Sequence, residues 1–567
     1  MLYGAGAIAG LYHIVSHAPE LNQRSAAVRA SGEGGDSGEV GSDIELMYNQ
    51  PLAADRAGLR LVAYREETPG WLNNAGVNQS NTNTTVRQGA RATALIRFGG
   101  TWSLTMRALT QRIDSGDSQY AEAGLRLVRR TSILESNHTD FSLLNATVRG
   151  SIKTGEFTST TSFSRHLLSG LSEAYGTVGT VAISPTSTAV YDDGRTNQAF
   201  DQEFRFTALA SPTPWSIGMF ISNRQRERTG SLFTNVLVRS AQYTLDRSDD
   251  AVEFAGYGDI SFPFSEKWTL AIAGRASGTR LSTTGAAQAF PGSRSDDFSG
   301  KRTEWGVAPK ASLSYEPRTG SLYYLTIANG YRTGGFNVGD AALLTAPTRD
   351  QPNREYAGDN VWTLEAGAKR SFFNQRVDMR AGAFWQDWIN IQTDQLQVAG
   401  LPFTGNVGDG VSRGVELEAN YRVSSDLSAH GFVRYTDSEV TNPNATFPVR
   451  ANSRLPGVPN FMASASAQYD RPISANTHFL LSTQVLYVGR ATQGFSAQNV
   501  TPIGGYTEVN LRTGLVGEKW SLTAFVNNAA DAATATFAYG NPFLFGQSGT
   551  VTPLRPRSYG LELGRDF

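Results

Sequence analysis

The feature that most constrains the fold is the pattern of the final residues, 556–567. Tyr559, Leu561 and Leu563 fall on alternate positions, with polar residues or glycine between them. In an extended strand successive side chains point to opposite faces, so this spacing gives one apolar face and one polar face. The pattern continues to the terminal Phe567. The chain therefore ends in a strand whose apolar face needs a cover.

A strand of this kind also needs a partner for its edge, because an unpaired edge with an apolar face promotes aggregation. Both needs are met if lipid covers the apolar face and the first strand of the chain pairs with the last. The segment resembles the closing strand of bacterial outer-membrane β-barrels, which typically end in an aromatic residue. An ordinary C-terminal edge strand of a soluble protein is the alternative.

Four other segments begin with Trp just after a predicted turn and carry apolar residues at every second position. They start at Trp102, Trp215, Trp268 and Trp520. Trp favours the lipid headgroup region, where its ring is buried and its N–H stays hydrated. We therefore expect these residues in the inner-rim aromatic girdle of a membrane barrel. In a soluble β-sandwich, the alternative, they would lie in the core.

Short turns alternate with long polar segments along the chain. The tight turns include residues 99–101 and 517–519, whereas the polar segments include residues 166–197 and 338–359. About ten turns on one rim join about twenty strands, and a further strand at each end gives about 22, an even number as a single bacterial chain requires. The sequence thus predicts an all-β fold, a transmembrane antiparallel β-barrel with short periplasmic turns and long extracellular loops.

Composition excludes several other classes of protein. No run of about 18 apolar residues occurs, which excludes transmembrane helices. The chain contains no cysteine, which excludes thiol and disulfide chemistry. Its net charge of −1 gives no basis for binding nucleic acid. No basic region, apolar core and cleavage site follow Met1, so we expect any export signal to lie upstream of this numbering.

Several segments resemble TonB-dependent outer-membrane receptors of the siderophore-receptor type. Residues 331–337, Tyr-Arg-Thr-Gly-Gly-Phe-Asn, are similar to a Tyr-Lys/Arg-Ser/Thr-Gly-Gly-Phe-Asn stretch common in that family. Residues 412–416, Ser-Arg-Gly-Val-Glu, are similar to its Ser-x-Gly-x-Glu strand, and the glycine-rich residues 2–10 resemble the end of its plug domain. The resemblance implies that residues 1–20 are a plug remnant and residues 21–567 the barrel.

The resemblance also implies a function. It indicates an outer-membrane receptor and transporter, not an enzyme, that takes up iron–siderophore complexes with energy from the TonB–ExbB–ExbD system. We expect a monomer surrounded by lipids in a Gram-negative outer membrane, without a cofactor. Cobalamin, haem or an oligosaccharide remain open as ligands. A passive outer-membrane pore and a soluble all-β binding protein are the competing predictions.

Residues 1–20 would be only the end of a plug, without the TonB box. The resemblance therefore implies that this chain alone neither couples to TonB nor holds its channel shut. Three hypotheses follow: a fragment of a full receptor, a barrel whose plug is a separate polypeptide, or an open plugless pore. The first two are favoured.

Candidate ligand-binding residues lie beside the predicted extracellular loops. Arg332, Phe336 and Asn337 adjoin a long loop and are expected to contact the ligand. His138 and His166 fall at predicted loop bases, where they could touch a metal complex. No histidine has a partner at a zinc-type spacing, so neither a metal site nor a catalytic residue is predicted.

Arginines on the polar phase of the strands are expected to line the lumen: Arg107, Arg205, Arg275 and Arg434. They could guide an anionic ferric chelate by Coulomb attraction. They could instead pair with acidic groups of a plug, because charges buried in an interface need partners. The second, structural interpretation is favoured.

Overall fold

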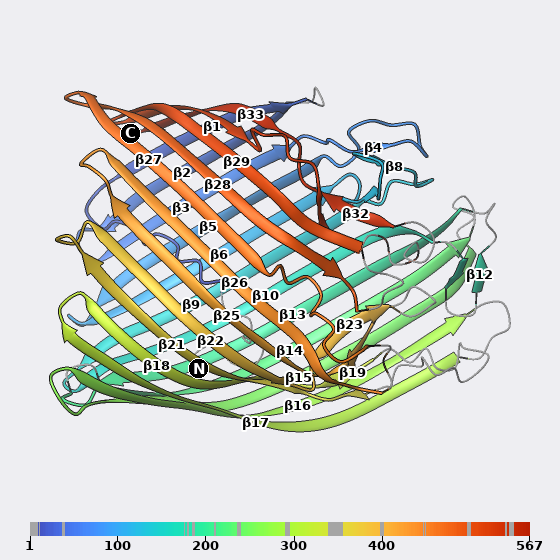
Figure 1. Ribbon diagram of the computed structural model, residues 1–567, viewed down its shortest axis with the longest axis horizontal. Coiled ribbons are helices and arrows are strands. Elements are labelled where there is room, and N and C mark those ends of the chain that lie inside the picture. Colours follow the sequence, from blue (N-terminus) through green and yellow to red (C-terminus); the bar gives the residue numbers. More distant parts are fainter. Residues whose placement is uncertain are drawn as a thin grey trace.

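The chain folds into one large β-barrel, seen here in a computed structural model (Figure 1). The structure describes residues 10, 12–36, 40–174, 176–178, 181–183, 188–208, 211–234, 240–289, 295–337, 355–396, 402–445, 447, 449–495, 501–538, 541, 543 and 549–567. Most of the glycine-rich segment 2–10 lies outside these residues. Among the described residues, no helix is long and apolar enough to cross a membrane.

The barrel wall is a single 22-stranded sheet. Its strands are β1 (Ser25–Gly35), β2 (Val40–Ala53), β3 (Ala57–Thr68), β5 (Thr85–Phe98), β6 (Trp102–Ser115), β9 (Asn137–Ile152), β10 (Gly155–Ala174), β13 (Ala189–Ala208), β14 (Trp215–Thr234), β15 (Ser240–Pro263), β16 (Trp268–Ala289), β17 (Ser295–Arg318), β18 (Ser321–Arg332), β21 (Asp359–Phe372), β22 (Val377–Ile389), β25 (Gly408–Arg422), β26 (Leu427–Pro443), β27 (Phe461–Ser474), β28 (Thr477–Gln493), β29 (Thr501–Gly517), β30 (Trp520–Asn527) and β33 (Ser558–Asp566).

Shorter strands belong to the connections between these wall strands. They are β4 (Asn73–Asn74), β7 (Ala121–Glu122), β8 (Val128–Arg129), β11 (Gly176–Val178), β12 (Val181–Ile183), β19 (Gly335–Phe336), β20 (Glu355–Tyr356), β23 (Gln392–Leu396), β24 (Pro402–Asn406), β31 (Ala535–Phe537) and β32 (Thr550–Pro553).

The last strand closes the barrel. β33 pairs antiparallel with β30 on one side and with β1 on the other, in a register that places Ala27 opposite Asp566. The backbone N–H of Phe567 adds a hydrogen bond of 2.9 Å to the carbonyl of Ala26. Because the sheet is closed, it has no free edge. The predicted strand number, and the pairing of first strand with last, are confirmed.

The outer face of the wall is apolar up to a defined height. On β14, Ile217 and Met219 are 58% and 63% exposed, as expected for side chains that face lipid. On β6 and β10 the apolar band ends at the outward-facing Arg112 and Arg165, which lie about ten residues above the short turns, a height of roughly 25 Å for tilted strands. The band therefore matches the thickness of an outer membrane.

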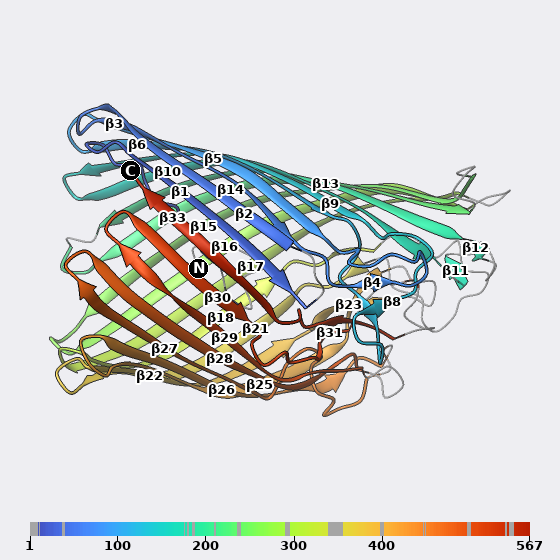
Figure 2. The same cartoon turned by 90° about the horizontal axis from the view of Figure 1, so that it is seen from above.

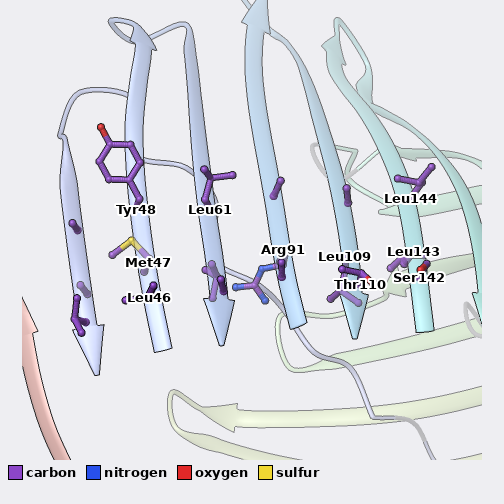
Figure 3. A pocket seen from close by; sticks show the side chains of 18 of the residues that line it. Leu46, Met47, Tyr48, Leu61, Arg91, Leu109, Thr110, Ser142, Leu143 and Leu144 are labelled. Atoms are coloured by element: carbon purple, nitrogen blue, oxygen red, sulfur yellow. The ribbon is translucent and has the colours of Figure 1, made fainter. Parts of the chain in front are cut away.

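The four predicted tryptophans begin β6, β14, β16 and β30, at the short-turn rim. They meet other rings there: Trp215 lies 5.4 Å from Phe206, and Trp268 lies 4.4 Å from Tyr315, measured between ring centroids. Higher on the same outer face, small side chains leave an apolar hollow of about 880 Å³ over the first strands. Figure 3 shows Leu46, Leu61 and Leu144 on the strands around it.

The long-loop rim is uneven. β13 to β17 contain 20 to 24 residues, whereas the neighbouring β18 and β21 contain 12 and 14. Figures 1 and 2 show these five strands extending past β18 and β21 at the end opposite the short turns. By the asymmetry of outer-membrane barrels, that end is extracellular. The upper parts of β13 to β17 are called the raised wall below.

Residues 19–23, just before β1, lie against the lumenal side of β2 and β3. The side chain of Asn49 accepts a hydrogen bond from the N–H of Glu20 (2.9 Å) and donates to the carbonyls of Glu20 (3.0 Å) and Gln23 (2.7 Å). Leu21 is buried, and its side chain lies against Gly58. The boundary between plug remnant and barrel stays a prediction.

Removing β33 is expected to prevent barrel formation. A chain that stops before Ser558 leaves β1 and β30 with unpaired edges, which lipid cannot satisfy with hydrogen bonds. We expect loss of the heat-modifiable band on a gel and loss of insertion into vesicles. The control is Leu561→Val, which keeps the strand and its outward apolar face. Normal folding of the truncated chain would contradict the closure.

Candidate functional site at the extracellular mouth

The raised wall carries arginines on its lumenal face. Arg195 on β13, Arg228 on β14 and Arg247 on β15 are direct cross-strand partners. On each strand, the arginine lies an odd number of residues from the exposed apolar residues, which are Phe200, Met219 and Phe254 on the three strands. Because successive side chains of a strand point to opposite faces, each arginine points into the lumen. Like charges directly opposite each other destabilise a sheet, so this row needs compensation.

The compensation is incomplete. Asp193 accepts from Arg195 at 2.6 Å and from Arg228 at 2.8 Å, and Asp249 lies 2.8 Å from Arg247. Two further arginines, Arg224 and Arg226, share the lumenal face of β14. Arg226 donates to the side-chain oxygen of Asn197 at 3.1 Å. Within the described residues, Asp193 and Asp249 are the carboxylates that pair with this group. The group is called the arginine wall and consists of Arg195, Arg224, Arg226, Arg228 and Arg247.

Two aromatic groups adjoin the arginine wall. His166 on β10 is the cross-strand partner of Asn197 and packs edge-to-face on Phe141, 5.8 Å between centroids. Tyr356 on β20 lies above the wall; burial raises the pKa of its hydroxyl, and the nearby Arg247 and Arg226 oppose that rise. The predicted His166 thus lies beside a cationic surface in the lumen.

His138 lies elsewhere. Alternation along β9 places His138 on the same face as Leu144, and pairing with β6 places it on the same face as Met106. Both of these residues are exposed on the lipid-facing side. Its two ring nitrogens contact Asp114 at 2.6 Å and Asp140 at 2.8 Å. The structure therefore places His138 on the outer surface of the barrel, above the apolar band, and not beside His166.

Arg332 is engaged within the protein. Its guanidinium forms two hydrogen bonds with the carboxylate of Asp359 and stacks 5.6 Å from the ring of Trp388. The same carboxylate accepts from the indole N–H of Trp388 at 2.8 Å and the N–H of Gln392 at 3.1 Å. Arg332 therefore joins the end of β18 to the start of β21 and to β23.

Phe336 and Asn337 brace the loops against the arginine wall. The ring of Phe336 is buried beside Gly300, and its carbonyl accepts from Arg247 at 2.7 Å. Asn337 exchanges two hydrogen bonds with the backbone of Thr404, at 2.8 and 2.9 Å. Ligand contact by these residues stays a prediction; in the structure they hold β19 and β24 in place over the mouth.

The predicted lumen arginines lie on inward-facing strand positions at lower levels. Arg275 is buried, 2.6 Å from Glu253, with Phe220 and Tyr257 around its guanidinium. Arg107 donates to Asn145 at 3.4 Å. Arg434 lies 3.3 Å from Glu416 and donates to the hydroxyl of Thr436 at 2.8 Å. Arg205 shares this face, at the level of the cross-strand position Gly218.

Sequence reasoning missed the arginine wall, although one signal was present. Residues 224–228 read Arg-Gln-Arg-Glu-Arg, which places three guanidinium groups on one face of a strand. Arg195 and Arg247 join them only through the register of three strands, which the sequence does not reveal. Among the described residues, no group of three His, Asp or Glu side chains is placed to hold a metal ion.

A buried ion cluster lies beside the upper end of β10, next to the raised wall. Arg129 lies 2.9 Å from Asp117 and 2.5 Å from Glu135, and all three side chains are at most 4% exposed. Asn541, from the last loop, donates to Glu135 at 2.5 Å and to the carbonyl of Glu173 at 2.6 Å. The cluster therefore ties three segments of the extracellular face together.

Arg129→Met is expected to loosen this cluster strongly. The substitution leaves two buried carboxylates without their cation, which costs about 3–5 kcal/mol. We expect faster proteolysis within residues 116–136 while the heat-modifiable barrel band persists. Arg130→Met is the matched control, because Arg130 is 58% exposed and pairs only with Glu122 among the contacts described. Equal cleavage of the two variants would contradict the cluster's role.

Comparison with known proteins adds to this geometry. A family model described as TonB dependent receptor-like, beta-barrel matches residues 30–529. Pesticin receptors from Yersinia enterocolitica and Yersinia pestis are 23% and 22% identical over 375 residues, which are 65% of this chain and 51% of each receptor. The chain thus spans about half the length of these curated relatives.

Solved structures show the same fold. The ferric yersiniabactin uptake receptor of Yersinia pestis has a TM-score of 0.84 at 16% identity, over 100% of this chain and 84% of that chain. A siderophore receptor of Acinetobacter baumannii has a TM-score of 0.75 at 13% identity, over 97% of this chain and 82% of that chain. At these identities the likeness concerns the architecture of the barrel.

Proposed function

The chain belongs to the TonB-dependent receptor-like β-barrel family, and from this premise we propose that it takes up an anionic iron–siderophore complex across a Gram-negative outer membrane. Members of the family are receptors and transporters. Energy for the transport step comes, in this proposal, from the TonB–ExbB–ExbD system acting through a plug. The ligand enters at the long-loop mouth and first meets the arginine wall.

The arginine wall is the observation that carries the proposal. Five guanidinium groups lie on one lumenal surface, where two carboxylates of the described residues pair with them. Guanidinium groups bind carboxylate, catecholate or hydroxamate oxygens through charge-assisted hydrogen bonds, which are stronger than neutral ones. A concave surface of one sign also raises the local concentration of the opposite charge. Both effects favour a ferric chelate with net negative charge.

The plug belongs to the proposal as well. We assign residues 1–20 to its final part. The pinning of the segment near Glu20 by Asn49 supports a strand that enters β1 from inside the lumen. A plug attached at this point would lie in the lumen, which the arginine wall also faces.

The test compares ligand uptake with and without TonB. Gram-negative cells that lack their own siderophore receptors receive this barrel together with a plug segment, and uptake of radioactive iron is followed for anionic and neutral ferric chelates. We expect uptake of an anionic chelate that disappears when TonB is deleted. Uptake that persists without TonB would instead support a passive pore.

A further inference from the structure

The lipid-facing side of the strands from β1 to β10 is hollowed in a region that the transport proposal does not use. Its upper part is the apolar hollow of about 880 Å³ (Figure 3), and a second hollow of about 390 Å³ lies nearer the short turns. Both are lined by Ala92, Ala108 and Leu144, so they form one continuous depression, called the trough. Pockets for drug-sized ligands measure about 300–1,000 Å³. The trough therefore has room for a specific occupant.

Short side chains on the outer face create the trough. Ala63 pairs across strands with Ala90, and Ala92 pairs with Ala108, so two alanine pairs lie side by side at its centre. At its border Leu144 is 58% exposed. Residues whose side chains point into the lumen also line the trough. Its floor is therefore the backbone of the sheet, which the alanines leave uncovered.

This backbone floor can lie against hydrocarbon. The ladders that join β2, β3, β5, β6, β9 and β10 pass the trough without a register shift, so the N–H and C=O groups of the floor are paired within the sheet. Backbone is tolerated next to hydrocarbon when its polar groups are satisfied in this way. An acyl chain in the trough thus has no polar group of the backbone to satisfy.

The extracellular end of the trough is polar. Thr110, Ser142 and Arg165 form one cross-strand row there. Thr161, which lines the lower part, is four residues before Arg165 on β10, a height of roughly 10 Å for a tilted strand. Since the apolar band is roughly 25 Å high and ends at Arg165, the trough faces the outer leaflet. Its polar row lies at the level of the lipid headgroups.

Arg165 supplies a positive charge at this end. Its side chain is exposed, and among the described residues no carboxylate pairs with its guanidinium. The acidic groups close to the row are already engaged: Asp114 lies 2.9 Å from Arg112, and Asp140 lies 2.8 Å from His138. Arg165 is therefore available to an anionic group that lies above the trough.

We propose that the trough binds the acyl chains of a phosphorylated glycolipid of the outer leaflet, with one lipid phosphate bound by Arg165. Guanidinium groups bind phosphate through charge-assisted hydrogen bonds, and basic groups beside an apolar membrane face recognise anionic headgroups. The trough crosses seven neighbouring strands about 4.8 Å apart, so its width is roughly 30 Å. This width suits a lipid with several acyl chains better than a phospholipid with a pair of chains.

The proposal rests on the outer-membrane location in the proposed function, and not on the transported ligand or on TonB. Native mass spectrometry of the folded full chain in detergent tests it. The chain is incubated with lipid A, with phosphatidylglycerol or with phosphatidylcholine, and the retained lipid is counted. We expect lipid A to bind about tenfold more tightly than phosphatidylcholine, as one charge-assisted contact predicts. Equal retention of these two lipids, or of lipid A and phosphatidylglycerol, would overturn the proposal.

Two pairs of substitutions distinguish the trough from the rest of the lipid-facing surface. Ala92→Leu with Ala108→Leu fills the trough at a cross-strand pair. Ala366→Leu with Ala383→Leu adds the same atoms to an outward-facing cross-strand pair on β21 and β22. We expect the first pair, and not the second, to reduce retention of lipid A. Equal retention by the two variants would overturn the trough as the binding site.

Arg165→Gln tests the phosphate contact separately. We expect it to lower retention of lipid A by about tenfold and to leave retention of phosphatidylcholine unchanged. Arg413→Gln is the matched control, because Arg413 also points outward but pairs with Asp437 at 2.8 Å. Equal effects of the two glutamine variants would overturn the role of Arg165. If the first leucine pair does not show the heat-modifiable band, Ala63→Leu with Ala90→Leu fills the same trough.

Discussion

Reversing the charge of Arg224 and Arg226 together is expected to weaken binding of an anionic ferric chelate by about 100-fold or more. Each side chain supplies a charge-assisted contact of about 1.5–3 kcal/mol, and each 1.4 kcal/mol is tenfold in affinity. The two arginines are chosen because no carboxylate contact within the described residues holds them, so Arg224→Glu with Arg226→Glu breaks no ion pair of the wall. Quenching of tryptophan fluorescence in the detergent-solubilised chain measures the affinity.

The control for this experiment is Arg165→Glu. Arg165 lies on β10 with the same parity as the lipid-exposed Phe163, so the same charge change occurs on the outer side of the barrel. We expect no more than a small effect there. The loss at Arg224 and Arg226 should also shrink as salt rises from 0.01 to 0.15 M, because the screening length falls from about 30 to about 8 Å. Equal losses for the inner and outer variants would contradict a binding role for the arginine wall.

The sequence predicted those parts of the fold that depend on a single strand. Parity places Ile217, Met219 and Trp215 on one face, and that face meets lipid. The terminal strand ending at Phe567 needed a partner, and β1 is that partner. These predictions hold because every strand of a membrane barrel alternates apolar side chains toward lipid with polar side chains toward the lumen. This alternation does not depend on which strands are its neighbours.

The candidate site was harder to predict because it depends on register between strands. His138 and His166 were grouped as loop-base residues, yet strand parity sends His138 outward beside Asp114 and His166 inward beside Asn197. His138 lies six residues from the apolar Leu144, and this even spacing alone would have predicted that His138 faces outward. The partnership of Arg332 with Asp359 could not have been found, since it joins two strands across a long loop.

Register also explains the difference between an arginine motif and the arginine wall. Arg224, Arg226 and Arg228 are visible as alternate positions in the sequence, but Arg195 and Arg247 are brought opposite Arg228 only by the pairing of β13, β14 and β15. A shift of one residue in either ladder would turn one of these rows outward. The charge of the lumenal surface is therefore a property of the assembled sheet.

The chain of 567 residues, expressed alone, is expected to conduct ions steadily in a planar bilayer and to prefer anions. A barrel of about 22 strands encloses a lumen wider than its own side chains can fill. Residues 19–23 are held against the wall of β2 and β3 by Asn49 and by the contact of Leu21 with Gly58, so this part of the described segment does not cross the lumen. The arginine wall then sets the sign of the selectivity, since fixed cations in a confined pore concentrate anions.

The reversal potential in a salt gradient separates this result from its alternatives. Arg224→Glu with Arg226→Glu should move the reversal potential toward cation selectivity at unchanged conductance, whereas Arg165→Glu should leave both unchanged. A silent bilayer would mean that the chain fills its own lumen, so that a separate plug is not needed to close it. A steady conductance that a plug polypeptide suppresses when added from the short-turn side would mean instead that the barrel is built to receive one.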